Sequence, residues 1–518
     1  MVGERQSVPL KGYLEQYELK GPCGLRTTLE LMERISHVTR PSGKEGPMGD
    51  LLVAIAKEYD LLCQRDEIGN VVMYCPGSSG CQNAPGIVLQ SHQDMICKAD
   101  EGKPNPAEHG VQPIVIFSDG PWVATDGTTG GYDNSAGIAQ SLAYALDRTA
   151  IHGPLMLVFT VGEETDMRGV NNFGFAIDPQ KYPFMVNLDN EEEGVLAIGT
   201  AAAGYTEISM PVEREDLRNK SYLKIKVSGT KKDRHSGLDI HKGRINAVKI
   251  LAGGLSGLIG PDGTSNIHLV EITGDNAPQH IRNSISREAE AVVALDPDQV
   301  EIVKRKIEEY QRRMKRENET NDPDLEITVE DHQYDSDSVS AMTVDSTKKT
   351  VETLMNLPHG VYQYKEGHPD MVITSTNLAI ASSGLNETNL SISMMTRSAD
   401  LTELETLRRK IANLIAEEGV SVSQSEIIKG YKAKDNSRLL PLSSAVYRGL
   451  FGRELVQRVY HAGAEMGEFG VRFPDLDIVS MGATLHNPHD TKEQINISSI
   501  YRCNKFLWTL GREIAQNY

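Results

Sequence analysis

The sequence predicts an α/β fold in which a mixed, mainly parallel sheet carries helices on both faces and an α+β domain is inserted. The stretches at residues 86–94, 155–164 and 184–189 each contain a short, mostly apolar run that is typical of a strand buried on both faces. Segments of helical periodicity alternate with these runs, as they do in sheets covered by helices. From about residue 206 the strands instead alternate apolar and polar residues, which indicates a second, half-exposed kind of sheet.

The length of the chain predicts more than one domain. With 518 residues it exceeds what a single core supports, so we expect at least two domains. Residues 1–205 and 430–518 are expected to form the first, and residues 206–429 the inserted one, in two α+β halves. A charged helix is expected over residues 299–316, followed by an acidic, mobile segment at residues 317–338.

Composition and charge argue against several classes of protein. No apolar run approaches the roughly 18 to 20 residues that cross a bilayer, and residues 1–6 lack a signal-peptide core, so we expect a cytoplasmic protein without a membrane partner. The net charge of −19 argues against a nucleic-acid partner. The six cysteines contain no CxxC pair and are expected to be reduced thiols.

The first hundred residues end in a candidate metal ligand. Helices are expected within residues 26–60, and a strand follows the turn at residues 69–74. The next strand, at residues 86–92, ends in His92, with Asp94 two positions further along. An aspartate placed there can accept the second ring N–H of the histidine and orient it toward a metal. The alternative is a pair of surface residues.

A glycine-rich loop at residues 125–137 precedes an amphipathic helix and places Asp133 near the helix N-terminus. Asp133 either caps this helix or, because glycines allow the backbone to approach a ligand closely, bridges two metals. No Gly-Lys-Ser/Thr sequence follows the glycines, which argues against a nucleotide site.

Two adjacent carboxylates, Glu163 and Glu164, follow the strand at residues 155–162, at the end where open α/β sheets keep their active sites. Consecutive residues point in different directions, so one glutamate can ligate a metal while the other handles a proton. Two solvated carboxylates are the alternative. Asp189 follows the next buried strand, and His489 lies in the loop after the last one.

The inserted domain shows strand and helix patterns of its own. Strands are expected at residues 207–212, 221–227, 267–272, 291–295, 371–373 and 390–395. A helix over residues 404–418 is expected to begin with a capping box formed by Thr402 and Glu405.

Together the strand ends and loops offer two histidines and three carboxylates: His92, Asp133, Glu164, Asp189 and His489. This set suits a pair of zinc-like divalent ions that share one bridging carboxylate. Two ions about 3.5 to 4 Å apart activate water and polarise a carbonyl, which is the chemistry of amide hydrolysis. Glu163 would then remain as the general base.

Six motifs strengthen this interpretation. They lie at residues 91–95, 125–134, 163–164, 187–194, 235–247 and 461–465. In these motifs, and in their order, the chain resembles the cytosolic aminoacyl-histidine dipeptidases (Xaa-His dipeptidases, or peptidase D). These belong to the co-catalytic zinc peptidases that include carnosinases and aminoacylases. The resemblance covers nearly the whole chain and implies a di-metal catalytic domain, an inserted lid, and hydrolysis of Xaa-His and related dipeptides.

The resemblance also implies a role for each ligand. His92 and Asp189 would hold one ion, Glu164 and His489 would hold the other, and Asp133 would bridge them. The ions would be two zinc ions, with cobalt or manganese as alternatives, because all three accept this ligand set.

For the reaction itself, the resemblance implies that Glu163 is the general base, that Asp94 orients His92, and that His235 of the lid stabilises the oxyanion. The substrate would be held by Arg397, Asn283 and His461. The lid is long enough for two of the units that simpler relatives carry. We therefore expect His235 to act within one chain, whether the protein is a monomer or a homodimer.

Departures from the family pattern leave the substrate open. Tyr132 precedes the bridging aspartate, and the loop around His489 carries an additional histidine, His486, and Asp490, both expected to be solvated. One alternative is a related amide hydrolase, either a tripeptidase or an N-acyl-amino-acid deacylase. Another is an inactive scaffold, but Glu163 and all five ligands are present.

Overall fold

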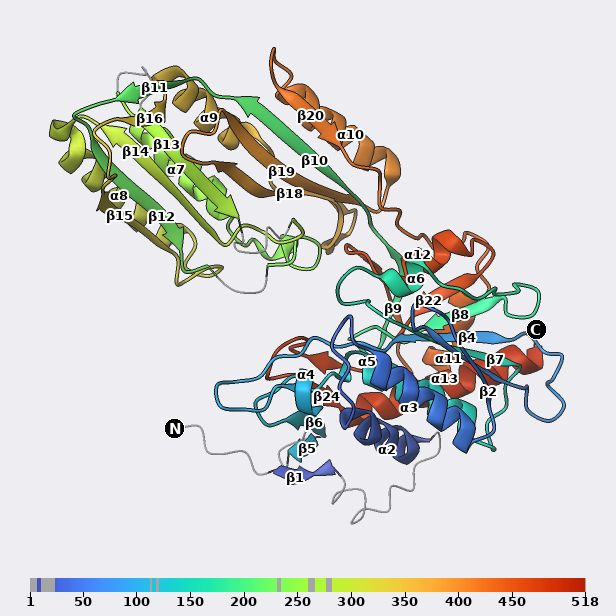
Figure 1. Ribbon diagram of the computed structural model, residues 1–518. Coiled ribbons are helices and arrows are strands. Elements are labelled where there is room, and N and C mark those ends of the chain that lie inside the picture. Colours follow the sequence, from blue (N-terminus) through green and yellow to red (C-terminus); the bar gives the residue numbers. More distant parts are fainter. Residues whose placement is uncertain are drawn as a thin grey trace. The chain divides into compact units, whose positions relative to one another are not determined.

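The computed structural model describes residues 7–10, 24–111, 114–117, 121–230, 234–259, 266–275 and 282–517. Contacts divide the chain into two compact units (Figure 1). The first comprises Met1–Thr200, Tyr431–Val459 and Ala464–Tyr518, and the second comprises Ala201–Gly430 and Tyr460–Gly463. The predicted boundary after residue 205 falls inside strand β10 (Ala202–Pro211), whereas the division observed lies just before that strand.

The first unit is built on an eight-stranded sheet of order β2-β3-β7-β4-β8-β22-β9-β21. Its strands are β2 (Leu62–Arg65), β3 (Val71–Cys75), β4 (Ile87–His92), β7 (Leu155–Thr160), β8 (Phe184–Asn187), β9 (Val195–Thr200), β21 (Val456–Tyr460) and β22 (Asp477–Ser480). The central strands β7, β4, β8 and β22 pair in parallel, and antiparallel pairs flank them. The predicted mixed sheet is confirmed, and the parallel strands lie at its centre.

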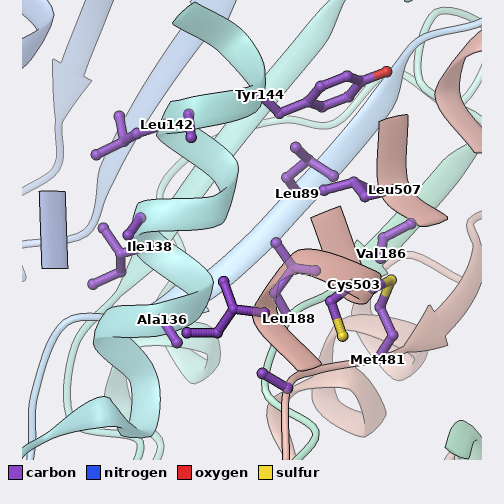
Figure 2. Packing of buried hydrophobic residues seen from close by; sticks show 14 of the residues in the cluster. Leu89, Ala136, Ile138, Leu142, Tyr144, Val186, Leu188, Met481, Cys503 and Leu507 are labelled. Carbon is purple, nitrogen blue, oxygen red and sulfur yellow. The ribbon is translucent and has the colours of Figure 1, made fainter. Parts of the chain in front are cut away.

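The helices of this unit are α2 (Leu25–Ser36), α3 (Gly46–Glu58), α4 (Pro106–His109), α5 (Tyr132–Leu146), α6 (Arg168–Asn171), α11 (Leu439–Phe451), α12 (Glu465–Arg472) and α13 (Ile497–Asn517). Figure 2 shows Leu507 of α13 beside Leu89 and Val186 of the sheet, and Ile138 and Leu142 of α5 belong to the same apolar cluster. The alternate residues of β4 and β7 are buried as well, so both faces of the sheet are covered. The apolar runs of the sequence are explained by this double burial.

A small five-stranded sheet of order β1-β5-β6-β24-β23 completes the first unit. Its strands are β1 (Ser7–Pro9), β5 (Ile114–Phe117), β6 (Trp122–Thr125), β23 (Leu485–His486) and β24 (Gln494–Asn496). The loop between β23 and β24 carries His489.

The second unit contains an antiparallel sheet of order β15-β12-β14-β13-β18-β19-β10-β20, with β17 paired to β18. Besides β10, these strands are β12 (Ser221–Ser228), β13 (His268–Asp275), β14 (Glu288–Leu295), β15 (Glu326–His332), β17 (Gly360–Lys365), β18 (His368–Ser383), β19 (Asn389–Ser398) and β20 (Ser421–Gln424). A two-stranded sheet joins β11 (Arg214–Leu217) to β16 (Val339–Met342). One apolar cluster packs the larger sheet against α7 (Ala247–Ile259), α8 (Val300–Glu317), α9 (Val344–Asn356) and α10 (Leu401–Leu414).

Two local predictions in this unit are wrong. The acidic segment at residues 317–338 was expected to be mobile, but β15 lies within it and pairs with β12 over seven residues. Polar residues, two of them acidic, alternate there with Ile327 and Val329, and a strand at a sheet edge keeps such side chains in solvent. Helix α10 is capped by Asp400, whose side chain accepts from the backbone N–H groups of Thr402 and Glu403, so Thr402 is not the cap.

None of the helices in the described ranges combines the length and the apolar character needed to cross a membrane.

Candidate metal centre

The predicted ligands of the first unit come together where its parallel strands end. His92 is the last residue of β4, Glu164 follows β7, and Asp189 follows β8. Asp133 lies in the first turn of α5, and His489 comes from the loop between β23 and β24. Their donor atoms form two groups, each within 4.8 Å, that share Asp133: His92, Asp133 and Asp189 in one, and Asp133, Glu164 and His489 in the other.

Asp133 offers one carboxylate oxygen to each group. Its Oδ1 lies 2.9 Å from His92 Nε2, and its Oδ2 lies 3.2 Å from His489 Nε2. His92 Nε2 also lies 3.3 Å from Asp189 Oδ1, and His489 Nε2 lies 2.8 Å from Glu164 Oε2. A carboxylate shared in this way has the geometry of a bridge between two cation sites.

The charges of the cluster favour a cation. Burial raises the pKa of Asp133, but hydrogen bonds from His489 and His92 outweigh it and lower that pKa. Burial lowers the pKa of His489, but its bonds to Asp133 and Glu164 raise it to about 11. Glu164 Oε1 is buried and has no hydrogen-bond partner among the described residues. The three carboxylates thus favour positive charge on the two imidazoles, and one carboxylate oxygen still lacks a hydrogen-bond partner among the described residues. Divalent metal ions would supply both the positive charge and the missing partner.

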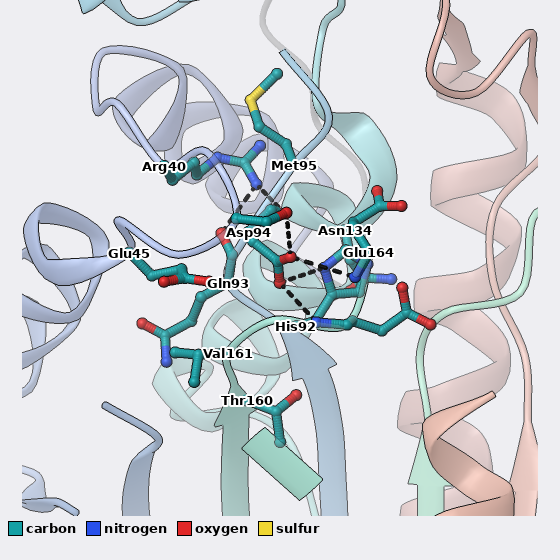
Figure 3. Close-up of polar contacts among 12 residues, drawn as sticks. Arg40, Glu45, His92, Gln93, Asp94, Met95, Asn134, Thr160, Val161 and Glu164 are labelled. Carbon is teal, nitrogen blue, oxygen red and sulfur yellow. Dashed lines mark hydrogen bonds and ion pairs between the residues drawn. The ribbon is translucent and has the colours of Figure 1, made fainter. Parts of the chain in front are cut away.

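Asp94 connects the end of β4 to the glutamate loop (Figure 3). Its carboxylate accepts from the backbone N–H groups of Glu163 at 3.1 Å and Glu164 at 3.2 Å, and from Ser42 Oγ at 2.7 Å. Asp94 Oδ1 lies 3.4 Å from His92 Nδ1. Although burial raises the pKa of Asp94, His92 and these donors lower it to about 2, so the carboxylate is ionised. Asp94 thus fixes both the imidazole and the loop that carries the two glutamates.

Glu163 leaves the same loop as Glu164 but belongs to neither donor group. Burial raises its pKa well above the ordinary value, and Asp189 and Glu164 raise it further against the opposing effect of His92. A carboxyl group in such surroundings holds a proton more readily than one in water, which suits a general base beside a metal centre.

A second carboxylate, Glu493, holds the glycine-rich loop in place. It accepts from four consecutive backbone N–H groups, those of Gly130 at 2.7 Å, Gly131 at 2.8 Å, Tyr132 at 2.7 Å and Asp133 at 3.3 Å. Glu493 is 1% exposed. It therefore positions the bridging aspartate through the backbone. Sequence reasoning missed this role, because a glutamate in a polar loop gives no sign of burial.

Arg40 and Asn134 also position the centre, because their side chains donate hydrogen bonds to the segments that carry its ligands. The buried guanidinium of Arg40 donates to the backbone carbonyls of Gln93 at 3.1 Å and Asp94 at 3.0 Å. The Asn134 amide donates to the Leu188 carbonyl at 2.9 Å and also to the Asp189 carboxylate. Neither residue was predicted to take part. The Asp133–Asn134 peptide bond is cis.

The predicted substrate residues and His235 belong to the second unit. Arg397 Nε donates to Ser236 Oγ at 3.4 Å, and the Asn283 carbonyl accepts from the Ser236 N–H at 2.7 Å. His461 Nε2 lies 2.7 Å from Ser375 Oγ. Burial and the nearby charge of Arg397 lower the pKa of His461 to about 3, so this imidazole is neutral.

His235 is also neutral, and its tautomer is fixed. Its Nδ1 accepts from the backbone N–H groups of Gly237 and Leu238, both at 3.1 Å. Burial lowers its pKa to about 4, and Arg397 contributes to the decrease. The ring proton consequently lies on Nε2, which leaves a neutral N–H donor.

His486 and Asp490, the two other residues that the sequence singles out near His489, lie outside the donor groups. The His486 ring packs against Trp122 with 4.5 Å between ring centroids and the planes tilted by 32°, and the Asp490 carboxylate accepts from the Lys492 N–H. Both contacts stabilise the loop that carries His489.

Comparisons with known proteins relate the chain to peptidases. Over 490 residues the chain is 29% identical to the cytosol non-specific dipeptidase of Escherichia coli (strain K12), covering 94% of this chain and 96% of that protein. The crystal structure of aminoacylhistidine dipeptidase from Vibrio alginolyticus superposes with a TM-score of 0.72 at 27% identity, over 94% and 96% of the two chains. Aminopeptidase PepT from Bacillus cereus shares the fold, with a TM-score of 0.58, 12% identity, and coverage of 95% and 99%.

The family model of peptidase family M20/M25/M40 matches residues 111–512, which is more than half of the chain. The resemblance drawn from the motifs is confirmed, and the chain is a hydrolase of the peptidase class. It belongs to peptidase family M20/M25/M40.

Proposed function

We propose that this protein is a dipeptidase that hydrolyses Xaa-His and related dipeptides with two divalent metal ions. The observation that carries the proposal is the shared carboxylate of Asp133, which faces His92 through one oxygen and His489 through the other. Two relatives that align over nearly their whole length are named as dipeptidases, one non-specific and one for aminoacyl-histidine. A range of dipeptides that includes Xaa-His is consistent with both names.

The two donor groups would each hold one ion. His92 and Asp189 complete one set around Asp133, and Glu164 and His489 complete the other. Three protein ligands at each ion leave positions open for water and substrate, as in catalytic zinc sites. We propose zinc in both sites, while cobalt and manganese accept the same donors. Bound divalent ions would lower the pKa of water and polarise the scissile carbonyl.

Glu163 would move the proton. It accepts a proton from the attacking water as the new carbon–oxygen bond forms, and it returns this proton to the leaving amine as the carbon–nitrogen bond breaks. Its raised pKa favours the uptake of this proton from water. Asp94 would keep the base in place, since it binds the backbone N–H of Glu163.

The polar cluster of the second unit would bind the rest of the substrate. We propose that the neutral N–H of His235 donates to the developing oxyanion and that Arg397 pairs with the free carboxylate of the dipeptide. Arg397 is 4% exposed, and burial lowers its pKa to about 10, so it stays charged at neutral pH. Asn283 and His461 would line the same subsite.

We also propose a cytoplasmic location, because the Escherichia coli relative is named a cytosol enzyme. The assembly, whether monomer or homodimer, is expected to leave activity per chain unchanged.

The test is release of free histidine from β-alanyl-histidine and from α-linked Xaa-His dipeptides, with and without added zinc or manganese. We expect metal-dependent release by the unmodified protein, and a loss of about 10²-fold or more in kcat for Glu163→Gln, because general base catalysis typically supplies that factor. Zinc binding should persist in this variant, since Glu163 is outside both donor groups.

Two outcomes would contradict the proposal. Metal-loaded protein that releases no amino acid from any dipeptide but does cleave tripeptides or N-acetylated amino acids would move the assignment to another amide hydrolase. Metal-loaded protein inactive on all three substrate classes would favour a scaffold.

A further inference from the structure

A band of buried polar side chains crosses the central strands just before the metal ligands. Gln90 in β4, Thr160 in β7, Asn187 in β8 and Ser480 in β22 are each at most 2% exposed. Strands in the middle of a parallel sheet are normally apolar on both faces, since burying a polar group without a partner costs free energy. Buried polar residues in the central strands, next to the metal ligands, therefore indicate a specific role.

The band is a continuous hydrogen-bond network between neighbouring strands. Gln90 is the register partner of Asn187, whose amide donates to Gln90 Oε1 at 2.5 Å. Asn187 is also the register partner of Ser480, which donates to Asn187 Oδ1 at 2.5 Å. Gln90 Nε2 lies 3.1 Å from Thr160 Oγ1. The side chains thus connect four parallel strands beyond their backbone bonds.

Glu465, the first residue of α12, is where this network ends. It is 0% exposed, and its Oε2 accepts from Gln90 Nε2 at 2.5 Å and from Thr160 Oγ1 at 2.6 Å. Its Oε1 is buried without a hydrogen-bond partner among the described residues. A carboxyl group with one unpaired oxygen lowers stability, so its presence points to a role other than stabilising the fold.

The position of the network relative to the ligands suggests that role. Gln90 lies two residues before His92 in β4, so both project from the same face, and Asn187 ends β8 two residues before Asp189. Thr160 is the register partner of His92 and precedes the glutamate loop by three residues. Glu465 therefore joins the three chain segments that supply most of the metal donors.

We propose that Glu465 is a positioning residue of the metal centre. Through Gln90 and Thr160 it holds the ends of β4 and β7 together, and through Asn187 it holds the end of β8 at the spacing that the ligands require. Residues that do not bind the metal but orient its ligands through hydrogen bonds typically contribute 10- to 100-fold to metal affinity. This inference rests on the metal centre of the proposed function.

The charge of Glu465 is not required for this role. Burial raises its pKa to about 8, so the carboxyl is mainly neutral at pH 7. A glutamine has nearly the same shape and keeps the acceptor oxygen for Gln90 and Thr160. A leucine fills the space but offers no acceptor.

The test measures zinc affinity of the full chain by competition with a chelator, together with the visible spectrum of the cobalt-substituted protein. We expect Glu465→Leu to bind zinc 10- to 100-fold more weakly and to show an altered cobalt spectrum, and Glu465→Gln to stay within threefold of the unmodified protein. The matched control is Thr28→Val. Thr28 is also 0% exposed and accepts from Asn504 at 2.9 Å, but it lies in the helical layer, so its loss should leave the affinity unchanged.

Two results overturn the proposal: unchanged affinity and spectrum in Glu465→Leu, or a loss in Glu465→Gln as large as in Glu465→Leu. If Glu465→Leu fails to fold, Thr160→Val decides, because it removes one donor to Glu465 at constant shape. A loss of at least threefold supports the role, and no loss overturns it. Failure of the unmodified protein to bind zinc would refute the metal centre itself, whereas normal binding by all variants refutes only the role of Glu465.

Discussion

Glu493→Gln tests whether the bridging aspartate is held through its backbone. In the native chain the two carboxylate oxygens accept from two backbone N–H groups each, within the segment from Gly130 to Asp133. A glutamine keeps one acceptor oxygen and turns an NH₂ group toward the other pair of donors. Burial and the nearby Asp133 raise the pKa of Glu493 to about 7, so we take the lower end of the range for bonds to charged acceptors, about 1.5 kcal/mol each. Two lost bonds then cost about 3 kcal/mol.

The assay compares thermal unfolding with zinc affinity, measured by chelator competition. We expect Glu493→Gln to lower the thermal midpoint and to weaken zinc binding 10- to 100-fold, because the loop that presents Asp133 loses two of its four anchors. The control is Glu193→Gln. The Glu193 carboxylate accepts from Tyr447, Arg453 and Arg502 away from the donor groups, so this change should lower the midpoint but keep zinc affinity within threefold.

An unchanged zinc affinity in Glu493→Gln would refute the reasoning, since the loop would then hold Asp133 without the carboxylate. An equal loss of affinity in Glu193→Gln would also refute it, because general destabilisation would explain both results.

Two further predictions concern pH and metal removal. In chelator-treated protein, Glu465 holds a proton between pH 4.5 and about 8 that the unfolded chain has lost. Stability should therefore fall as pH rises through this window, by up to roughly 1.4 kcal/mol per pH unit. His92, Asp94 and Asp189 also act on this group, so the measurement is the difference in slope between native chain and Glu465→Gln; identical slopes would contradict the assignment. Separately, zinc at a hundred times its Kd should stabilise the first unit by about 2.7 kcal/mol, and a thermal midpoint indifferent to chelator and zinc would argue against a centre built on Asp133.

Much of the fold follows from apolar patterns alone. The runs that form β4, β7 and β8 are buried on both faces, and such strands leave little ambiguity in sequence. The strand β15 was missed because three of its seven residues are acidic, and an edge strand with one solvated face differs little from a polar loop in composition. Pattern analysis therefore works best where both faces of a strand are buried.

Four of the five ligands were predictable because each stands just after a buried strand or in a glycine-rich loop, whereas His489 lies in the polar loop between β23 and β24. Glu465 and Glu493 lack such a context, since one begins a short helix and the other lies in a polar loop. Their importance comes from partners far away in sequence, which no local pattern reveals. One signal was nevertheless present: each central strand turns polar near its end, at Gln90, Thr160 and Asn187, and a buried polar residue requires a partner.

The metal-free centre tolerates its own negative charge because its histidines bind protons. Asp133, Glu164 and Asp189 lie within one cluster, and burial together with their mutual repulsion opposes ionisation of Glu164 and Asp189. Without metal, protons on His92 and His489 offset this repulsion, as their raised pKa values indicate. Metal ions must displace those protons, so binding should release protons and strengthen as pH rises. A zinc affinity independent of pH between 6 and 8 would show that the imidazoles are already neutral in the metal-free protein.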